Sequence, residues 1–404
     1  MVIPADIPKI CLAEIDLHPI LGLLSVVRMP ASTIPDLIVK THADPDPANM
    51  CMQMFYVLLA LGQHEFALDM QARALEQRCL YRIAGPAAPA IRLLALMGPG
   101  DMMDNTPFEF VVENSDIRLD LLFLLPGQEL PEIIPDHDVA IVAIGESDKN
   151  RPLLAHMEAL LATWPRPVLN HPQYILRCAR DTAYQLLNDI PGLLIPATRR
   201  LEREQIRRSR FPITIRPVDT HGGNGLVKLD IDVELDAYFE LYPDTAYYVA
   251  EYVDYRAEDG LFRKTRIALI DGKPYVCHLA ISDNWMVHYH SAGMEFSEKK
   301  RAEEAAMMEN FDQDFSVRHR AALAAIADRL GLDYVVLDCG EMRDGRLLLF
   351  ETDSRGWIHS TDPVDIFPYK QKVMQKAFDA FRTMLLNHSE SRCQSIHGPG
   401  AWPS

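Results

Sequence analysis

The chain has 404 residues, which is long enough for two or three domains with buried cores. Its 40 Lys and Arg residues against 57 Asp and Glu residues give a formal net charge of −17, which argues against a general nucleic-acid binder because phosphate contacts need a basic face. The seven cysteines are scattered without a C-x-x-C motif, which argues against a disulfide framework and a zinc ribbon. No apolar run reaches the ~18 residues that cross a bilayer, and residues 1–11 do not form a secretory signal, so we expect a cytoplasmic enzyme with no membrane partner.

The first 88 residues are predicted to be mainly helical. Between Asn49 and Leu80 apolar residues recur every three or four positions, with a break at Gly62, and this pattern predicts two helices in a hairpin. The hairpin is similar to one tetratricopeptide-type repeat, and no second copy is evident. A lone helix pair cannot bury its own apolar face, so we expect it to dock on the next domain, on a partner or on a second copy of the chain. A plain helical cap is the alternative.

Residues 89–180 alternate between short apolar runs and helical stretches. Strands are expected at Ile91–Met97, Leu121–Leu125, Val139–Ile144 and Pro167–Asn170, and a helix at Leu153–Thr163. This alternation predicts an α/β domain on a parallel sheet. Substrates bind such sheets beyond the carboxyl ends of the strands, which are here Gly145–Asp148 and Asn170–Pro172.

Residues 181–388 are dominated by strands, which makes this part α+β. A basic stretch, 199–210, is expected to form a solvated helix, with proximity to phosphate as the alternative. The strands are expected at 211–218, 225–230, 246–253, 263–270, 275–282, 334–342 and 346–353, with a helix at 318–331 and a hairpin turn at Asp344–Gly345. Residues 389–404 are rich in Ser, Pro and Gly and are expected to be a disordered tail.

A glycine-rich loop follows the strand that ends at Arg216, and the next strand carries Lys228. The glycines at 222, 223 and 225 would let backbone N–H groups approach an anion closely. The loop does not match G-x-x-x-x-G-K-[ST], and it opens onto a strand rather than the helix that a dinucleotide fingerprint requires. From the residues alone, a phosphate-binding loop and a plain hairpin turn both remain open.

Three carboxylates gather at the ends of a predicted strand pair. Asp338 ends one strand, while Glu351 and Asp353 occupy alternate positions on its hairpin partner and so share one face. Packed carboxylates repel one another unless a cation neutralises them, and hard oxygen ligands suit Mg²⁺. The pattern predicts a magnesium site, and exposed acids at strand ends are the alternative.

The glycine loop and the carboxylate hairpin, in this order along the chain, resemble the ATP-grasp family and its RimK-like branch over residues 90–386. The resemblance implies two antiparallel sheets that enclose a nucleotide. It also implies an ADP-forming ligase that uses ATP and Mg²⁺ to join a carboxylate to an amine through an acyl-phosphate, with small molecules or peptides as substrates. A catalytically silent ATP-binding adaptor and a ligase that modifies a peptide or protein terminus are the alternatives.

The resemblance also implies roles for individual residues. Nucleotide contacts are assigned to Arg180, Arg216, His221, Gly222, Gly223, Asn224, Gly225, Leu226, Lys228, Glu251, Tyr252, Val253 and either Asp254 or Asp259. Catalytic contacts are assigned to Arg266 and Arg355, and metal ligation to Asp338, Glu351 and Asp353. Contacts to the amine substrate are assigned to His278, Asp283, Asn284, Trp285 and His288. Arg216 and Thr182 stand where the family usually has Lys, and Arg180 or Arg177 could replace the second contact.

Overall fold

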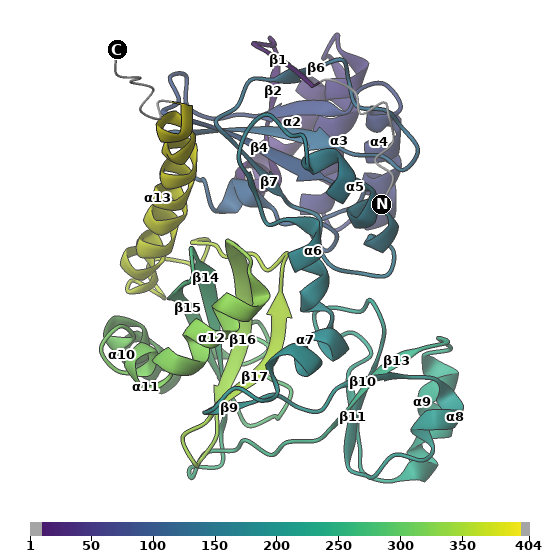
Figure 1. Ribbon diagram of the computed structural model, residues 1–404, viewed down its shortest axis with the longest axis vertical. Coiled ribbons are helices and arrows are strands. Elements are labelled where there is room, and N and C mark those ends of the chain that lie inside the picture. Colours follow the sequence, from purple (N-terminus) through teal and green to yellow (C-terminus); the bar gives the residue numbers. More distant parts are fainter. Residues whose placement is uncertain (1–9, 397–404) are drawn as a thin grey trace, which may run out of the picture.

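The protein is described by a computed structural model that places residues 10–396 (Figure 1). A six-stranded sheet occupies the first half of the chain, in the order β2-β3-β5-β4-β7-β8. Its strands are β2 (Pro19–Ile20), β3 (Leu80–Ile83), β4 (Ile91–Met97), β5 (Ile117–Phe123), β7 (Val139–Val142) and β8 (Val168–Leu169). All neighbours in this sheet are parallel except β3 and β5. The predicted parallel α/β sheet is therefore confirmed.

Helices cover both faces of this sheet, because its central strand is apolar on both sides. In β4, Leu93 packs with the N-terminal helices, while its neighbour Leu94 packs with α5 on the opposite face. The N-terminal helices are α1 (Leu23–Val27), α2 (Ile34–His42), α3 (Pro47–Ala60) and α4 (His64–Leu75), and the opposite face carries α5 (Arg151–Leu161) and α6 (Pro172–Ile175).

The predicted helical hairpin is confirmed as α3 and α4. Asp46 caps α3 by accepting the backbone N–H groups of Ala48 and Asn49, and Gly62 turns the chain with φ +72°. The hairpin docks on the parallel sheet. The first 88 residues are less uniformly helical than expected, because β2 and β3 join the parallel sheet and β1 (Cys11–Ala13) pairs with β6 (Ile133–Pro135).

Two antiparallel sheets follow, in agreement with the predicted fold class. The five-stranded sheet has the order β15-β14-β16-β17-β9, antiparallel except at β9, and the four-stranded sheet has the order β10-β13-β11-β12. The five strands are β9 (Leu193–Leu194), β14 (Phe262–Ile270), β15 (Lys273–Ser282), β16 (Tyr334–Glu341) and β17 (Leu347–Asp353). The four strands are β10 (Arg199–Leu201), β11 (Ile213–Pro217), β12 (Val227–Leu229) and β13 (Tyr247–Glu251).

Helices flank both sheets, with α13 running from the five-stranded sheet up to the parallel sheet (Figure 1). They are α7 (Arg180–Leu187), α8 (Arg203–Ile206), α9 (Leu235–Leu241), α10 (Glu298–Asn310), α11 (Phe315–Arg318), α12 (Arg320–Leu330) and α13 (Lys370–Ile396). Single 3₁₀ turns are η1 (Ala31–Thr33), η2 (Phe108–Phe110), η3 (Leu176–Cys178), η4 (Asp232–Glu234) and η5 (Met294–Phe296). Within residues 10–396, no helix is both long and apolar enough to cross a bilayer.

Two local expectations differ from the structure. The basic stretch 199–210 is not one helix, because its first three residues pair with β13 as β10 and only Arg203–Ile206 is helical. Helix α13 continues through Ile396, so the range expected as a disordered tail begins as helix, and residues 397–404 lie outside the described residues. The division of the chain into domains stays a prediction.

Candidate active site

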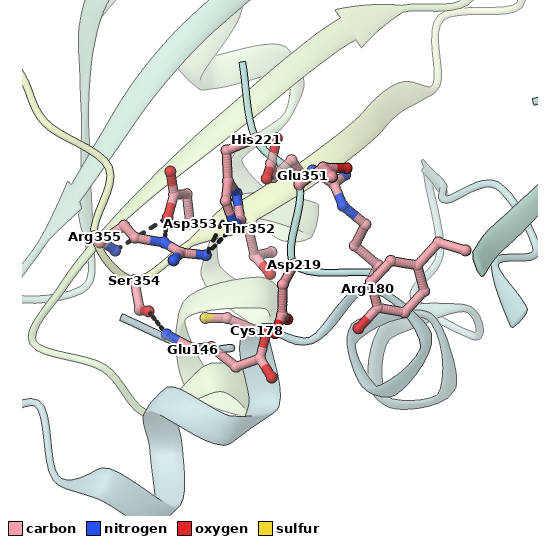
Figure 2. A pocket seen from close by; sticks show the side chains of 12 residues that line it. Glu146, Cys178, Arg180, Asp219, His221, Glu351, Thr352, Asp353, Ser354 and Arg355 are labelled. Carbon is pink, nitrogen blue, oxygen red and sulfur yellow. Dashed lines mark hydrogen bonds and ion pairs between the residues drawn. The ribbon is translucent and has the colours of Figure 1, made fainter. Parts of the chain in front are cut away.

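A small polar cavity lies where the two antiparallel sheets meet the carboxyl end of strand β7 (Figure 2). Its walls come from the end of β17, the loop after β11, strand β13, the start of α7 and the segment after β7. The lining residues are Glu146, Cys178, Arg180, Asp219, Thr220, His221, Tyr248, Glu351, Thr352, Asp353, Ser354 and Arg355. The cavity thus gathers part of the predicted set, namely Arg180, His221, Glu351, Asp353 and Arg355.

Asp338 is buried beneath two basic side chains from the neighbouring strand β14. The Nε of Arg266 lies 2.9 Å from Oδ1 of Asp338, and the Nζ of Lys264 lies 3.0 Å from Oδ2. Register explains the contact, because Asp338 lies directly opposite Arg266 on β14 and opposite Glu351 on β17. Burial raises the pKa of Asp338, but Arg266 and Lys264 outweigh it and hold the pKa well below its usual range. Asp338 is therefore a buried anion.

Glu351 is paired with a cation from a different element. Arg180, the first residue of α7, donates to its carboxylate. Burial raises the pKa of Glu351, yet Arg180 and then Arg216 lower it to about 2. Glu351 is therefore ionised and sits between two guanidinium groups.

Arg216 is the buried cation that lacks a carboxylate partner. It is 6% exposed, its Nε donates to Oγ1 of Thr220 at 3.0 Å, and its other hydrogen bond goes to the Thr220 carbonyl. Within residues 10–396 it forms no ion pair. Burial and the nearby Arg180 lower the pKa of Arg216 to about 9, although Glu351 opposes this.

The glycine loop touches both the parallel-sheet domain and the five-stranded sheet. Asp219 accepts the backbone N–H of Asp148 at 2.9 Å, and the ring of His221 lies 2.8 Å (Nε2) from a guanidinium nitrogen of Arg355. A Cβ built on Gly223, whose φ is +80°, would come within 2.2 Å of Nε2 of His288. That buried Nε2 has no hydrogen-bond partner. The loop therefore packs against His288, with an unsatisfied polar atom beneath Gly223.

The side chain of Arg355 contacts residues from three different segments around the cavity (Figure 2). It points at both His221 and Asp353, its Nε lying 3.5 Å from Oδ1 of Asp353, and it donates to the carbonyl of Met103 at 2.6 Å. Burial and Arg355 lower the pKa of His221 to about 3, so this ring is neutral. Burial raises the pKa of Asp353, and Arg355 only partly offsets it.

The predicted magnesium ligands are close together, but each already forms an ion pair with a basic side chain. Within the described part of the chain, no group of three or more His, Cys, Asp or Glu residues is arranged to hold a metal ion. Each predicted ligand forms an ion pair with a basic side chain instead: Asp338 with Arg266, Glu351 with Arg180, and Asp353 with Arg355. The donor set itself consists of hard carboxylate oxygens on two paired strands, which suits Mg²⁺, but an ion would compete with these arginines.

The predicted adenine-reading segment lies outside the cavity lining, at the hinge between the two antiparallel sheets. Tyr252 follows β13, its N–H donates to the carbonyl of Pro212 at 3.1 Å, and its ring lies 5.7 Å from that of Trp285. The Nζ of Lys228 lies 4.6 Å from the centroid of the Tyr252 ring. Glu251 is exposed and Val253 packs against the core of the five-stranded sheet. None of these residues lines the cavity, so their contact with a nucleotide stays a prediction.

The other predicted contacts are further away. Asp259 lies in an exposed turn, where its carboxylate pairs with Arg263 at 2.7 Å, and it does not line the cavity. His278 is opposite Arg266 in register, and burial, with Arg266, holds its pKa well below the usual range. The remaining predicted contact residues, Asp283 and Asn284, lie in a turn after β15 that does not line the cavity.

Sequence reasoning did not select several lining residues. Glu146 follows β7, at the strand end where the sequence indicated a substrate site, and burial raises its pKa to about 7 although Arg151 opposes this. Asp219 and Ser354 are next to selected residues, so proximity along the chain was a signal. No signal in the sequence indicated Cys178 and Tyr248, because only the folded chain brings η3 and β13 to the cavity.

No protein-family model matches the chain, and no curated protein matches it. Among solved structures, the D-Ala:D-Ser ligase VanG from Enterococcus faecalis is 13% identical, with 73% of this chain and 99% of that chain covered and a TM-score of 0.46. The ATP-grasp ligase PsnB in complex with a precursor peptide and AMPPNP is 16% identical, with coverages of 75% and 100% and a TM-score of 0.41. A RimK-domain ATP-grasp protein from Sphaerobacter thermophilus is 15% identical, with coverages of 73% and 99% and a TM-score of 0.40. This chain is thus similar to solved ATP-grasp proteins over 73–75% of its length, at low identity.

Proposed function

We propose that the protein is an ATP-dependent ligase of the ATP-grasp type that joins a carboxylate to an amine. The observation that carries this proposal is the buried, unpaired guanidinium of Arg216 beneath the glycine loop. A buried charge is costly unless an anion meets it, and the loop offers backbone N–H groups at the same place. The unsatisfied Nε2 of His288 below Gly223 adds a further polar contact. A phosphate chain would satisfy all of these groups at once.

The remaining charges of the site suit the transfer of a phosphoryl group to a carboxylate. A carboxylate oxygen of the substrate would attack the terminal phosphorus of ATP and release ADP, and the amine would then attack the acyl carbon and release phosphate. Arg355 and Arg266 would bind the negative charge of the substrate and of the transferred group. Water must be kept out, because it would hydrolyse the acyl-phosphate, and the glycine loop lies where it would exclude water. When bound by Asp338, Glu351 and Asp353, Mg²⁺ would supply neutralisation of phosphate charge.

A thermal melt with ATP and Mg²⁺ tests the nucleotide part of the proposal. The ligand should raise the melting temperature by mass action, and Arg216→Gln should reduce that shift because it removes the unpaired cation. Arg207→Gln is the matched control, since it removes an arginine of the same sheet region that pairs with Asp236 at the surface. An absent shift at millimolar ATP in folded wild-type protein would contradict the proposal. Release of ADP, screened over amino acids and peptides with mass spectrometry of products, then identifies the substrates.

One observation favours a second candidate, an ATP-binding adaptor without turnover. The three carboxylates of the site are already neutralised by arginines of the protein itself. The adaptor would give the same ATP-dependent melting shift as the ligase. It would release no ADP with any carboxylate and amine pair, and no Mg²⁺ dependence of ATP binding would be seen.

A further inference from the structure

A second cavity lies between the N-terminal helices and the parallel sheet. Its lining is mainly apolar and includes the rings of Phe55 and Tyr56 from α3 and of Phe123 from β5. Two carboxylates line the same cavity, that of Glu109 in η2 and that of Asp101, which accepts the backbone N–H of Met103 at 2.7 Å. We call it the Glu109 cavity.

The carboxylate of Glu109 is buried without a counter-charge. The side chain is 7% exposed, and its Oε1 accepts the backbone N–H of Leu23 at 3.1 Å. In the described part of the chain, no basic side chain forms an ion pair with it. Other buried acids differ, since Asp120 pairs with Arg82 at 2.6 Å and Glu304 pairs with Lys370 at 3.4 Å. Burial raises the pKa of Glu109 to about 7, although the Leu23 N–H opposes this.

The two amide side chains of the cavity, Gln71 and Asn105, are satisfied by the backbone. Gln71 donates to the carbonyl of Gly100 and accepts its N–H, both at 2.7 Å. Asn105 exchanges the same pair of bonds with Gly98. Asp101 lies 3.6 Å from the ring of His64 at the partly exposed side, so among the described lining residues Glu109 is the buried carboxylate that has no basic neighbour and could recognise a charged occupant. It would do so among aromatic rings, whose faces attract organic cations.

The space limits the size of such an occupant. About 30 Å³ of the cavity admits a water-sized group, which is room for two or three such groups at about 10–15 Å³ each. A primary ammonium with its first methylene fits, whereas a bulkier quaternary ammonium does not. Leu59 and Met102 line the same cavity and are only half-buried, so an alkyl chain would continue along them towards the surface.

We propose that the Glu109 cavity is a binding site for a primary alkylammonium group, with the charge at Glu109 and the alkyl chain against Phe55, Tyr56 and Phe123. The proposal does not depend on the ligase assignment. The cavity also adjoins the candidate active site, because Met102 lines it while the carbonyl of the next residue, Met103, accepts a hydrogen bond from Arg355. An occupant would thus contact the segment that holds Arg355.

Calorimetric titration of the full chain with n-butylammonium, without ATP, tests this proposal. We expect saturable binding in the millimolar range or tighter. n-Butanol keeps the shape without the charge and should bind at least about tenfold more weakly, because it cannot pair with the carboxylate. Butyrate should not bind. Equal binding of butanol, or no saturable binding of butylammonium, would overturn the proposal.

Two variants locate the site. Glu109→Gln keeps an acceptor for the Leu23 N–H and should weaken butylammonium binding at least about tenfold. Glu113→Gln is the matched control, because that nearby acid pairs with Arg28 and does not line the cavity, so binding should be unchanged. If Glu109→Gln does not fold, Phe55→Leu serves instead and should also weaken binding, since it removes a ring from the lining. Wild-type binding in a folded Glu109→Gln or Phe55→Leu protein would place the ligand elsewhere.

Discussion

The four-stranded lobe, residues 199–251, and the rest of the molecule, here called the body, differ in how their cores are built. The lobe has a small hydrophobic cluster of its own, which contains Ile215 and Tyr247 and no residue of the body. In the body the parallel sheet and the five-stranded sheet share clusters, so that Leu94 of one and Leu337 of the other lie in the same cluster. Figure 1 shows the lobe set apart beside α7. The body should therefore unfold as one unit and the lobe as a smaller one.

The proposed site divides along the same line. Its carboxylates stand on the body, on β16 and β17, whereas Arg216 and the glycine loop belong to the lobe. Polar contacts connect the two at the site, including Asp219 to the Asp148 N–H and His221 to Arg355. The carboxylates of the proposed site therefore belong to the shared core of the body, while the loop that we propose to cover the phosphates belongs to the separate lobe and reaches the body through polar contacts.

The largest expected effect is on stability and tests whether lobe and body are separate units. Leu337→Ala removes a fully buried side chain of the body and should cost about 2–5 kcal/mol of global stability. Ile215→Ala removes an equally buried side chain of the lobe, and its cost should be confined there. Melting temperatures, together with amide hydrogen exchange of β11 and β16, distinguish the two. Equal loss of protection in β16 with both variants would show a single cooperative unit.

The next effect concerns turnover and the rigid carboxylates. Glu351→Gln keeps the shape but removes a charge, so ADP release should fall ~100-fold or more, which is about 2.7 kcal/mol of transition-state free energy. Glu341→Gln is the control, because that acid pairs with Arg318 outside the cavity. Near-normal turnover of Glu351→Gln would move the site away from this hairpin.

The third expected effect is a dependence of stability on pH that arises from His137 in the body. Burial lowers the pKa of His137 to about 4, although the Pro135 carbonyl opposes this, and its Nε2 accepts the Trp164 indole N–H at 3.0 Å. In the unfolded chain His137 binds a proton near pH 6.5, whereas in the native state it does so only near pH 4. The contribution of the neutral ring to the free energy of unfolding is therefore complete above pH 6.5 and is lost as the pH falls. Between about pH 7 and pH 5 the loss from this residue should be about 2 kcal/mol.

Urea unfolding at both pH values checks this sign in wild-type and His137→Gln protein. The glutamine has both a donor and an acceptor but does not titrate, so the variant should lose less stability at the lower pH. In the lobe the sole histidine is His221, in the glycine loop, so the lobe itself should respond less. An identical pH dependence in both proteins would contradict the assignment to His137.

The smallest effect distinguishes a covering loop from a plain turn. Gly223→Val would place a β-branched side chain against Nε2 of His288 in a backbone conformation with φ +80°, so turnover should fall at least about tenfold while adenosine binding at Tyr252 persists. Gly345→Ala is the control, since φ there is also positive, at +85°, but no atom lies within 4 Å of the added Cβ and the residue lies in the hairpin turn after β16, outside the cavity lining. Wild-type turnover in folded Gly223→Val protein would show that the loop does not cover the site.

Much of the fold was readable because its periodicity is strong. The apolar run of β4 and the alternation that ends β17 at Glu351 and Asp353 predicted strands that the structure contains. Helix α10 was missed, because EKKRAEEAAMMEN has no apolar stripe and packs through Glu304, whose carboxylate accepts hydrogen bonds from Tyr289 and Tyr369. A buried polar anchor of this kind has no sequence period.

The sequence by itself determined the longer strands, such as β4 and β17, and that Asp338, Glu351 and Asp353 share one end of a hairpin, because apolar runs and period-2 alternation fix these locally. Only the tertiary structure decided which charges meet. Arg180 reaches Glu351 across 171 positions of the chain, Met103 reaches Arg355 across 252, and Arg216 forms no ion pair of its own although Glu351 is near enough to interact with it. Such pairings depend on how separate elements pack, and burial then sets their electrostatics, so neither follows from spacing along the chain.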